Sequence, residues 1–387
     1  MNSPTTCHDG GVTLTDLLTP AVIVDRQRAL ANIDRLQDTA NKRGIRVRPH
    51  AKTHKSPQVA RWQIDRGAIG ICCAKLGEAE VFAAAGFTDI RIPYPIHPIN
   101  APRVLALLTR TDLSFIVDHL EVARGWSAAM VAAGRTVDVL IKVDVGFHRC
   151  GIDPNPRTAV PFIKAVASLP GLHFRGLLAH AGHAYHATSE DNLRAIAEDE
   201  ARTLRTLAQA AQAERVGIVE LSAGATPPAR FSLDQEGLTE YRAGNYVYFD
   251  RTQVGLGAAT LEDCALTVMA TVVSKPSANR IILDCGSKTL SSDGARGFAP
   301  LAGHGVIYRD VQMPEGVKPD KHLIIERLSE EHATVSVVSG ETSLEPGDRV
   351  RVVPNHSCVV SNLVDEAWVV DGERVTAMPI AARGRLT

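Results

Sequence analysis

The sequence of 387 residues lacks several features that define particular protein classes. No stretch approaches the roughly 18 to 20 continuous apolar residues of a membrane-spanning helix. The 42 basic residues nearly balance the 43 acidic ones, so no charge excess favours nucleic acid or an anionic membrane as a partner. The start, MNSPTTCHDGG, lacks the basic segment and apolar stretch of a signal peptide. These absences predict a soluble protein with no nucleic-acid or membrane partner.

Paired cysteine spacing is also absent. The chain has seven cysteines, an odd number, and none are arranged as in small disulfide-stapled domains. Cys72 and Cys73 are adjacent within an apolar run, which is typical of small core residues. Reduced thiols, and therefore a cytoplasmic location, are the expectation.

What the sequence does contain is a repeating pattern of short apolar runs and longer helical stretches from about residue 20 to 225. Alternating strands and helices predict a parallel sheet, and eight such units are the number that closes a (β/α)8 barrel. A doubly wound open sheet is the alternative. The runs are 21–25, 45–52, 69–75, 89–95, 113–118, 137–146, 174–182 and 218–224.

After about residue 255 the pattern changes to short β-branched runs separated by turns, such as RIILDCG and DRVRVVPNH. This is typical of antiparallel strands. We therefore predict an α/β protein with a TIM-type barrel over 21–255 and a C-terminal antiparallel β domain over 256–387. Residues 1–20 are assigned to the β domain, with GGVTLTDLL as an edge strand.

Lys52 follows the second apolar run, in RVRPHAKTHK. The active sites of such barrels lie where strands end, at the C-terminal face. A lysine there, beside His50 and Arg48, would lose hydration and meet like charge, and both effects lower an amine pKa. Lys52 is thus either an amine nucleophile or a solvated loop lysine.

Small residues dominate two later loops, SAGATPP (222–228) and AGNYVYFD (243–250). Such loops let backbone N–H groups approach a phosphate, and barrel phosphate sites often lie at the last loops. Together they either form one phosphate site or are two plain turns.

His356 and Cys358 lie two residues apart in PNHSCVVSN, a spacing that puts both side chains on one face of a strand. An imidazole and a thiolate suit Zn²⁺ more than Mg²⁺, and two ligands would leave positions open for substrate. A satisfied histidine beside a small apolar cysteine is the alternative. His180, His183 and His186 are expected to line a pocket, with acid–base roles open.

Taken in order, TPAVIVD, RPHAKTHKSP, GICCAKLGEAE, VDVGFHRCG, the small-residue loop and PNHSC resemble one enzyme family. The chain resembles the fold-type III pyridoxal-phosphate (PLP) enzymes that act on D-3-hydroxy amino acids. This family includes D-serine dehydratase, D-threonine aldolase and D-3-hydroxyaspartate aldolase. The resemblance covers about residues 18–385 and implies an alanine-racemase-like barrel followed by a β domain, in a homodimer.

The resemblance also implies roles for individual residues. Lys52 lies where the family has its Schiff-base lysine, and Arg149 matches the arginine that approaches the pyridine nitrogen. His356 and Cys358 match the metal pair, with Zn²⁺ favoured over Mn²⁺ or Mg²⁺. His186 is a candidate catalytic base. The remaining residues implied to bind the cofactor are His180, Tyr185, Gly224, Ala225, Thr226, Gly244 and Asn245.

One departure bears on the reaction. The aldolases carry His-x-Asp at the metal pair, whereas this chain has His356-Ser-Cys358, which resembles the dehydratase branch. We therefore predict a PLP- and metal-dependent dehydratase of D-serine, D-threonine or D-3-hydroxyaspartate that releases ammonia and a 2-oxo acid. An aldolase releasing glycine and an aldehyde is the alternative, followed by a racemase. A carboxylate-bearing substrate would need a further cation, for which Arg251, Lys288 and Arg296 are candidates.

Overall fold

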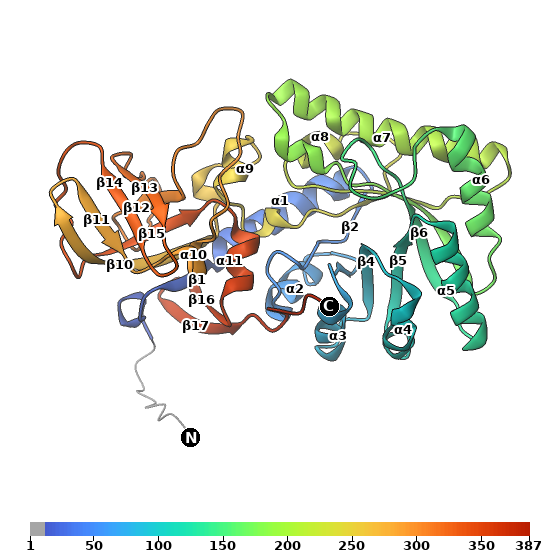
Figure 1. Cartoon of the computed structure of the whole chain (residues 1–387), viewed down its shortest axis with the longest axis horizontal. Helices are drawn as coiled ribbons and strands as arrows, with labels where there is room; N and C mark the ends of the chain where they lie inside the picture. The colour runs from blue at the N-terminus through green and yellow to red at the C-terminus, as the bar shows by residue number, and fades with distance from the viewer. Residues whose placement is uncertain (1–11) are drawn as a thin grey trace, which may run out of the picture.

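Parallel strands form the larger lobe of the computed structural model, which describes residues 12–387 (Figure 1). Eight strands lie in the order β2-β9-β8-β7-β6-β5-β4-β3. Backbone hydrogen bonds from Ile69 N to Val47 O (3.0 Å) and from Cys72 N to Pro49 O (2.8 Å) join the two end strands, so the sheet closes. The predicted barrel is confirmed. Its strands are β2 (Arg46–Val47), β3 (Ile71–Cys72), β4 (Asp89–Pro95), β5 (Asp112–Val117), β6 (Val137–Lys142), β7 (Leu172–Leu178), β8 (Glu220–Ala223) and β9 (Glu240–Tyr241).

Helices surround this barrel because each has one apolar stripe to bury. In α1 (Arg26–Lys42) the buried residues Ala29, Ile33, Leu36 and Ala40 recur at helical spacing, and the Asp25 carboxylate caps the helix by accepting from Arg28 N (3.0 Å). The others are α2 (Pro57–Ile64), α3 (Leu76–Ala84), α4 (Ala101–Leu107), α5 (Leu120–Ala132), α6 (Pro156–Ala167), α7 (Glu190–Ala213) and α8 (Ala229–Ser232). The short helix α9 (Arg251–Gly255) lies beside the β lobe instead (Figure 1).

The barrel has eight strands, as predicted, but one predicted strand lies outside it and one of its strands was not predicted. The first apolar run forms β1 (Ala21–Asp25), which pairs with strands of the other sheet and lies outside the barrel. The eighth barrel strand is instead β9, which the sequence analysis missed because only Glu240 and Tyr241 have strand geometry. The predicted barrel range 21–255 therefore includes one strand of the β domain.

The second lobe is a nine-stranded sheet with the path β13-β14-β11-β10-β1-β16-β17, in which β15 pairs with both β10 and β12. Its pairs are antiparallel except for β1 with β16, which run parallel. Besides β1 its strands are β10 (Leu266–Ser277), β11 (Arg280–Leu283), β12 (Gly305–Tyr308), β13 (Leu323–Leu328), β14 (Ala333–Val337), β15 (Arg349–Pro354), β16 (Glu366–Asp371) and β17 (Arg374–Pro379).

The edge strand predicted from GGVTLTDLL is not found in its described part. Leu14–Asp16 forms a short 3-10 helix, η1, with Thr13 and Asp16 hydrogen-bonded to each other at 2.6 Å. Gly10 and Gly11 of that prediction lie outside the described residues.

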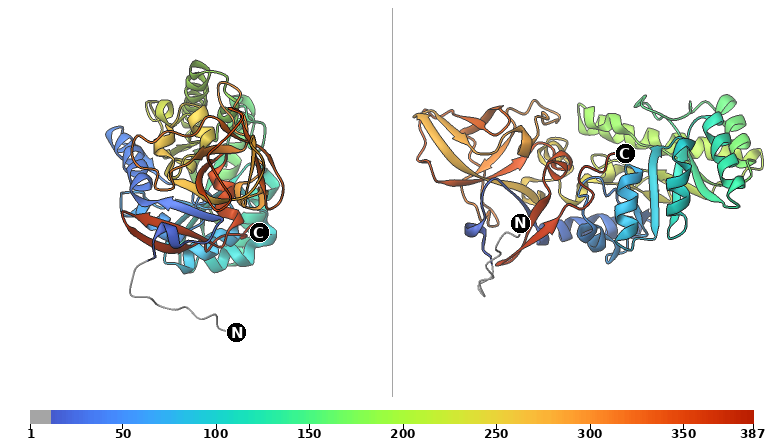
Figure 2. Two further views of the ribbon diagram at one scale, coloured as in Figure 1. Left: turned by 90° about the vertical axis from the view of Figure 1, so that its left-hand side faces the viewer. Right: turned by 60° about the horizontal axis from the view of Figure 1, so that its bottom comes forward.

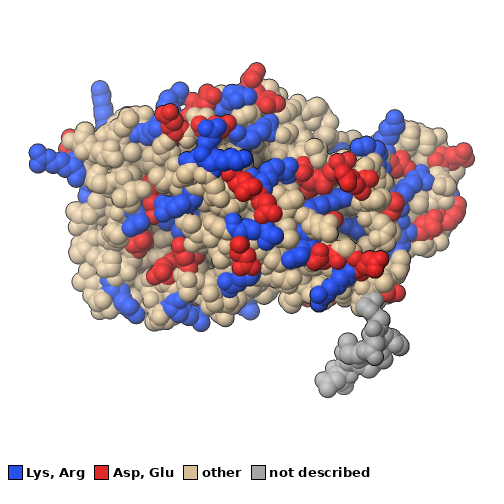
Figure 3. Space-filling view, turned by 180° about the vertical axis from the view of Figure 1, so that it is seen from behind, with Lys and Arg blue, Asp and Glu red and all other residues tan. Residues whose placement is uncertain are grey.

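The two lobes lie side by side along the long axis, joined by α1 and by the segment after α9 (Figures 1 and 2). The short helices α10 (Ser287–Leu290) and α11 (Ser357–Leu363) belong to the β lobe, and α11 lies on the side that faces the barrel. None of the helices in residues 12–387 combines the length and apolar composition of a bilayer crossing. On the face shown in Figure 3, basic and acidic side chains are interspersed.

Candidate active site

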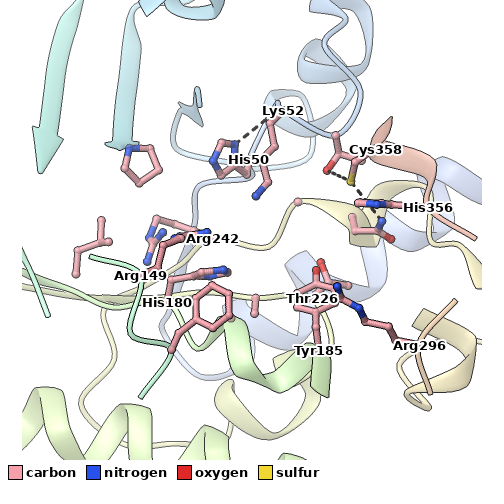
Figure 4. A pocket seen from close by; sticks show the side chains of 18 of the residues that line it. His50, Lys52, Arg149, His180, Tyr185, Thr226, Arg242, Arg296, His356 and Cys358 are labelled. Atoms are coloured by element: carbon pink, nitrogen blue, oxygen red, sulfur yellow. Dashed lines mark hydrogen bonds between the residues drawn. The ribbon is translucent and has the colours of Figure 1, made fainter. Parts of the chain in front are cut away.

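A cavity of about 380 Å³ lies between the C-terminal ends of the barrel strands and the β lobe (Figure 4). Both lobes contribute to its wall. Most of the residues predicted from the sequence line it: Lys52, Arg149, His180, Tyr185, Ala225, Thr226, Gly244, Asn245, His356 and Cys358. The cavity therefore brings together segments that are up to 300 residues apart in the chain.

Lys52 projects its ammonium group into this cavity from the loop that follows β2. Loss of hydration lowers the pKa of Lys52, and the positive charges of Arg149 and Arg242 lower it further, although Cys358 acts in the opposite direction. No carboxylate lies within 4 Å of its Nζ among the described residues. The amine is thus accessible from the cavity, and its surroundings favour the neutral form more than bulk water would.

Two neutral histidines lie beside Lys52. Burial, together with the charge of Lys52, holds the pKa of both His50 and His180 well below the usual value. His180 Nδ1 is within hydrogen-bond distance of the Gly224 carbonyl, which can only accept, so Nδ1 carries the proton. Its ring meets Phe147 edge-on, with 6.2 Å between ring centroids. A flat, uncharged imidazole therefore forms one side of the cavity.

The two small-residue loops meet at the cavity wall. A side chain at Gly224 would place its Cβ 2.6 Å from the Arg242 carbonyl oxygen, and one at Gly244 would place it 3.0 Å from Thr53 Oγ1. The Thr226 hydroxyl is buried and has no hydrogen-bond partner among the described residues. A buried unpaired hydroxyl is costly, and a bound oxyanion would satisfy it. The donor chemistry of this corner fits a phosphate group.

His356 and Cys358 reach the cavity from the first turn of α11. His356 Nδ1 contacts Asp293 Oδ2 at 2.6 Å, so Nε2 is the ring nitrogen that can meet Cys358 or a ligand. Cys358 Sγ lies 3.2 Å from Thr53 Oγ1 and 3.4 Å from Asn245 Nδ2. This carboxylate–histidine arrangement, with a thiol alongside, is the usual support of a metal-binding imidazole.

The electrostatics of the pair favour charged forms. Burial disfavours charge on both groups, but the hydrogen bond and the charge of Cys358 raise the pKa of His356 to about 10. Reciprocally, the contact with His356 outweighs burial and lowers the pKa of Cys358. No cluster of three or more His, Cys, Asp or Glu side chains with metal-site geometry occurs within residues 12–387. The arrangement fits a divalent metal with two protein ligands and open positions.

Two cavity residues were missed by the sequence analysis. Arg242 follows β9, and its Nε donates to Ser222 Oγ at 2.7 Å while Nη2 donates to the Ala179 carbonyl. Lys142 ends β6, and burial together with Arg242 lowers its pKa to about 7. A lysine at the end of the apolar run VDVLIK was a readable signal for Lys142. Arg242 was hidden because its two-residue strand went unrecognised.

Three residues predicted at the site, Gly224, His183 and His186, do not line the cavity. Gly224 contributes through its carbonyl, which contacts His180. His186 is exposed in the 3-10 helix η3 (Gly182–His186), with Nε2 3.4 Å from Arg296 Nη1. The structure thus places His186 at the outer edge of the site, beside Tyr185.

Comparison with known families agrees with this architecture. Residues 24–252 match the family "Alanine racemase, N-terminal domain", and residues 265–370 match the "Putative serine dehydratase domain". The first match covers more than half of the chain.

Individual relatives span nearly the whole chain. A D-threo-3-hydroxyaspartate dehydratase from Delftia sp. (strain HT23) is 34% identical, over 89% of this chain and 92% of that protein. A D-threonine aldolase from Arthrobacter sp. is 32% identical, over 95% and 93%.

Among solved structures, a cysteine-to-alanine mutant of a D-threo-3-hydroxyaspartate dehydratase, described as metal-free, has a TM-score of 0.89. It is 30% identical, and the match covers 95% of this chain and 98% of that one. A second mutant of that dehydratase replaces a histidine two positions before the cysteine.

The fold, the continuous matches to both family domains and the identity to these relatives agree with one another. The alanine-racemase-like barrel of this family implies PLP as the cofactor. The chain belongs to the family of PLP-dependent lyases that join an alanine racemase N-terminal barrel to a serine dehydratase domain.

Proposed function

We propose that this protein is a PLP- and metal-dependent dehydratase of D-3-hydroxy amino acids, which releases ammonia and a 2-oxo acid. The observation that carries this proposal is the presence of a cysteine, Cys358, as the second member of the predicted metal pair, in the same cavity as Lys52. The dehydratase relative supports it, because that enzyme has mutants at a histidine and at a cysteine two positions later, the latter being metal-free.

The cofactor, when bound, supplies an aldehyde that condenses with amines and a ring that withdraws electrons from the substrate Cα. Lys52 Nζ lies within the cavity, free of carboxylates, and is the amine that would hold the cofactor and then accept the Cα proton. The Thr226 hydroxyl and the loops at Gly224 and Gly244 would hold the phosphate. His180 would lie against the ring.

Two arginines, Arg149 and Arg242, could supply a positive charge near the pyridine nitrogen of the cofactor. The sequence assigned it to Arg149, whose guanidinium carbon lies 5.2 Å from the Phe147 ring centroid. Arg242 is the second, and it is more firmly fixed because Ser222 and the Ala179 carbonyl both accept from it. Either arginine would keep the adjacent nitrogen unprotonated, since two neighbouring positive charges repel each other.

The metal, when bound, supplies a Lewis acid for the substrate β-hydroxyl. His356 would bind it through Nε2, with Asp293 fixing the imidazole through Nδ1, and Cys358 would bind it as the thiolate. A thiolate and an imidazole favour Zn²⁺ over Mn²⁺ and Mg²⁺.

An aldolase that releases glycine and an aldehyde is the second candidate. The D-threonine aldolase relative at 32% identity supports it, and the same lysine and metal pair would serve that reaction. Homodimer formation and a cytoplasmic location stay predictions of the sequence.

A single product assay separates the two reactions. The purified protein, loaded with PLP and Zn²⁺, is offered D-serine, D-threonine and D-3-hydroxyaspartate. We expect equimolar ammonia and 2-oxo acid. Glycine with an aldehyde would establish the aldolase instead, and exchange of the Cα proton alone would indicate a racemase.

Replacing Cys358 tests the metal assignment independently of turnover. Cys358→Ala should lose at least about tenfold in Zn²⁺ affinity, because even groups that only support a ligand have effects of that size. Metal content after dialysis is the measurement, and the cofactor absorption band should persist. Cys285→Ala, a buried thiol of the β lobe remote from the cavity lining, is the matched control. Unchanged metal content in Cys358→Ala would refute the assignment.

A further inference from the structure

A carboxylate on the substrate beyond the β-carbon would need its own cation, and the structure separates the three candidates. This inference rests on the proposed function and deepens it. We propose that Arg296 binds a second substrate carboxylate, so that aspartate-type D-3-hydroxy acids are preferred over D-serine and D-threonine.

Arg251 and Lys288 are already committed elsewhere. Arg251 Nη1 donates to the carbonyls of Gly303 and Gly305, at 3.2 and 3.4 Å. Lys288 Nζ pairs with Glu330 and Glu331, at 2.9 and 2.8 Å, on the surface of the β lobe. Neither of these side chains lines the main cavity.

Arg296 differs from both. It lines the main cavity, and within residues 12–387 no carboxylate oxygen lies within 4 Å of its guanidinium nitrogens. Its guanidinium contacts the imidazole of His186, with 3.4 Å between Nη1 and Nε2. Its backbone is fixed, because Arg296 N donates to Thr252 Oγ1 at 3.2 Å. The guanidinium therefore has donors to spare for an anion.

Arg296 lies next to the predicted metal pair. A smaller cavity of about 180 Å³ adjoins the main one and is lined by Arg296, Tyr185 and His356, among others. Arg296 lies on the same side of the main cavity as His356, so a substrate whose β-hydroxyl meets the His356–Cys358 pair would have its β-carbon close to Arg296 (Figure 4). The β lobe thus supplies both the metal pair and the cation next to it.

Two carboxylates of this smaller cavity do not neutralise Arg296. Asp250 is buried and accepts from Asn245 Nδ2 (2.6 Å), Ser357 N (3.0 Å) and Gln253 N (3.1 Å). Asp293 is engaged with His356 Nδ1. The positive charge of Arg296 is consequently available to an anionic ligand in the smaller cavity.

The remaining cations lie on the other side of the cavity. Arg149 and Arg242 lie beside His180, across from Arg296 (Figure 4). They are available to the α-carboxylate and the cofactor ring, while Arg296 is available to the distal group. The hydrogen of D-serine or the methyl group of D-threonine at that place would leave Arg296 unpaired.

The test compares kcat/KM of the holoenzyme on D-3-hydroxyaspartate, D-threonine and D-serine in wild type, Arg296→Met, Arg296→Lys and the surface control Lys288→Met. Arg296→Met should lose about 10- to 100-fold on D-3-hydroxyaspartate and less than about threefold on the other two substrates, as expected for one charged hydrogen-bonding partner. Arg296→Lys should recover part of the loss, and Lys288→Met should match wild type.

Several outcomes would overturn the proposal. An equal loss on all three substrates would place Arg296 at the α-carboxylate, and weakened PLP binding in Arg296→Met would place it at the phosphate. Wild type that prefers D-serine or D-threonine would refute the preference while leaving the dehydratase function intact.

A binding experiment keeps the proposal testable if no substrate is dehydrated. D-aspartate and D-alanine both lack the β-hydroxyl, and each can be titrated against the cofactor absorption band. Arg296→Met should weaken the binding of D-aspartate about 10- to 100-fold and leave the binding of D-alanine unchanged. Equal effects on both amino acids would refute the role of Arg296.

Discussion

Lys52 acquires its chemistry from the side chains around it. The same residue type on the surface would stay protonated at neutral pH, whereas here lost hydration and the nearby Arg149 and Arg242 lower its pKa. From the motif RVRPHAKTHK we predicted that the positive charge of Arg48 would act on Lys52. Arg48 instead points into the barrel, where it forms ion pairs with Glu240 and Asp89. The like charge comes instead from arginines distant in the sequence.

Replacing Lys52 therefore tests the whole site. Lys52→Ala should lower kcat by about a thousandfold or more, because it removes the amine that would form the covalent bond to the cofactor. Borohydride reduction followed by mass spectrometry should find the cofactor fixed to wild type and absent from the variant. Lys75→Ala, whose ammonium lies over the Tyr94 ring outside the cavity, is the control. Full activity in Lys52→Ala would refute every enzymatic mechanism considered for this site.

Strand β9 positions cavity residues through a buried network of ion pairs and hydrogen bonds. Glu240 is fully buried and accepts from Arg48 Nε at 2.8 Å, Arg91 Nη1 at 2.5 Å and Ser222 Oγ at 2.6 Å. Burial opposes ionisation, but Arg91 and Arg48 lower the pKa of Glu240 to about 2. Ser222 also accepts from Arg242, so the network links the barrel interior to the cavity floor.

Glu240→Gln should destabilise the protein by about 3–5 kcal/mol, since it removes a fully buried carboxylate that Arg48 and Arg91 share and leaves them only Asp89 and Glu220 as counter-charges. Urea unfolding followed by circular dichroism is the measurement. Glu214→Gln removes the exposed partner of Lys164 and should cost less than about 1 kcal/mol. Equal unfolding midpoints for the two variants would contradict this account.

The same strand marks the limit of what the sequence predicts about the fold. Helical spacing and Val/Ile-rich runs were enough to identify the barrel, because each element buries one face. They did not distinguish AVIVD of β1 from the barrel strands, since sheet membership depends on pairing with residues far along the chain. Glu240–Tyr241 was too short to show any periodicity, and Arg242 was missed with it.

At the scale of the whole molecule, buried neutral histidines set the response to acid. His54 is fully buried, and burial lowers its pKa to about 3. An unfolded chain binds a proton at this residue below about pH 6.5, while the folded chain does not. The stabilisation from neutral His54 is therefore present above that pH and is lost as pH falls towards 3. His50 and His180 act in the same direction.

Between pH 7 and pH 5, His54 alone should account for about 2 kcal/mol of lost stability. The free energy of unfolding is measured by urea titration at both pH values. Its decrease from pH 7 to pH 5 should be about 2 kcal/mol smaller in His54→Gln than in wild type. An identical pH dependence in the two proteins would show that the pKa of His54 is the same in the folded and unfolded chains, which would contradict this account.

The central position of β1 has a consequence for synthesis. Val22 pairs with Val268, and Val24 pairs with Val369, so β1 has partners that are made some 245 to 345 residues later. The barrel between them can close while the nascent chain still lacks its C-terminal strands. An apolar β segment thus waits unpaired through most of translation, and this segment is the natural target for a chaperone acting on the growing chain.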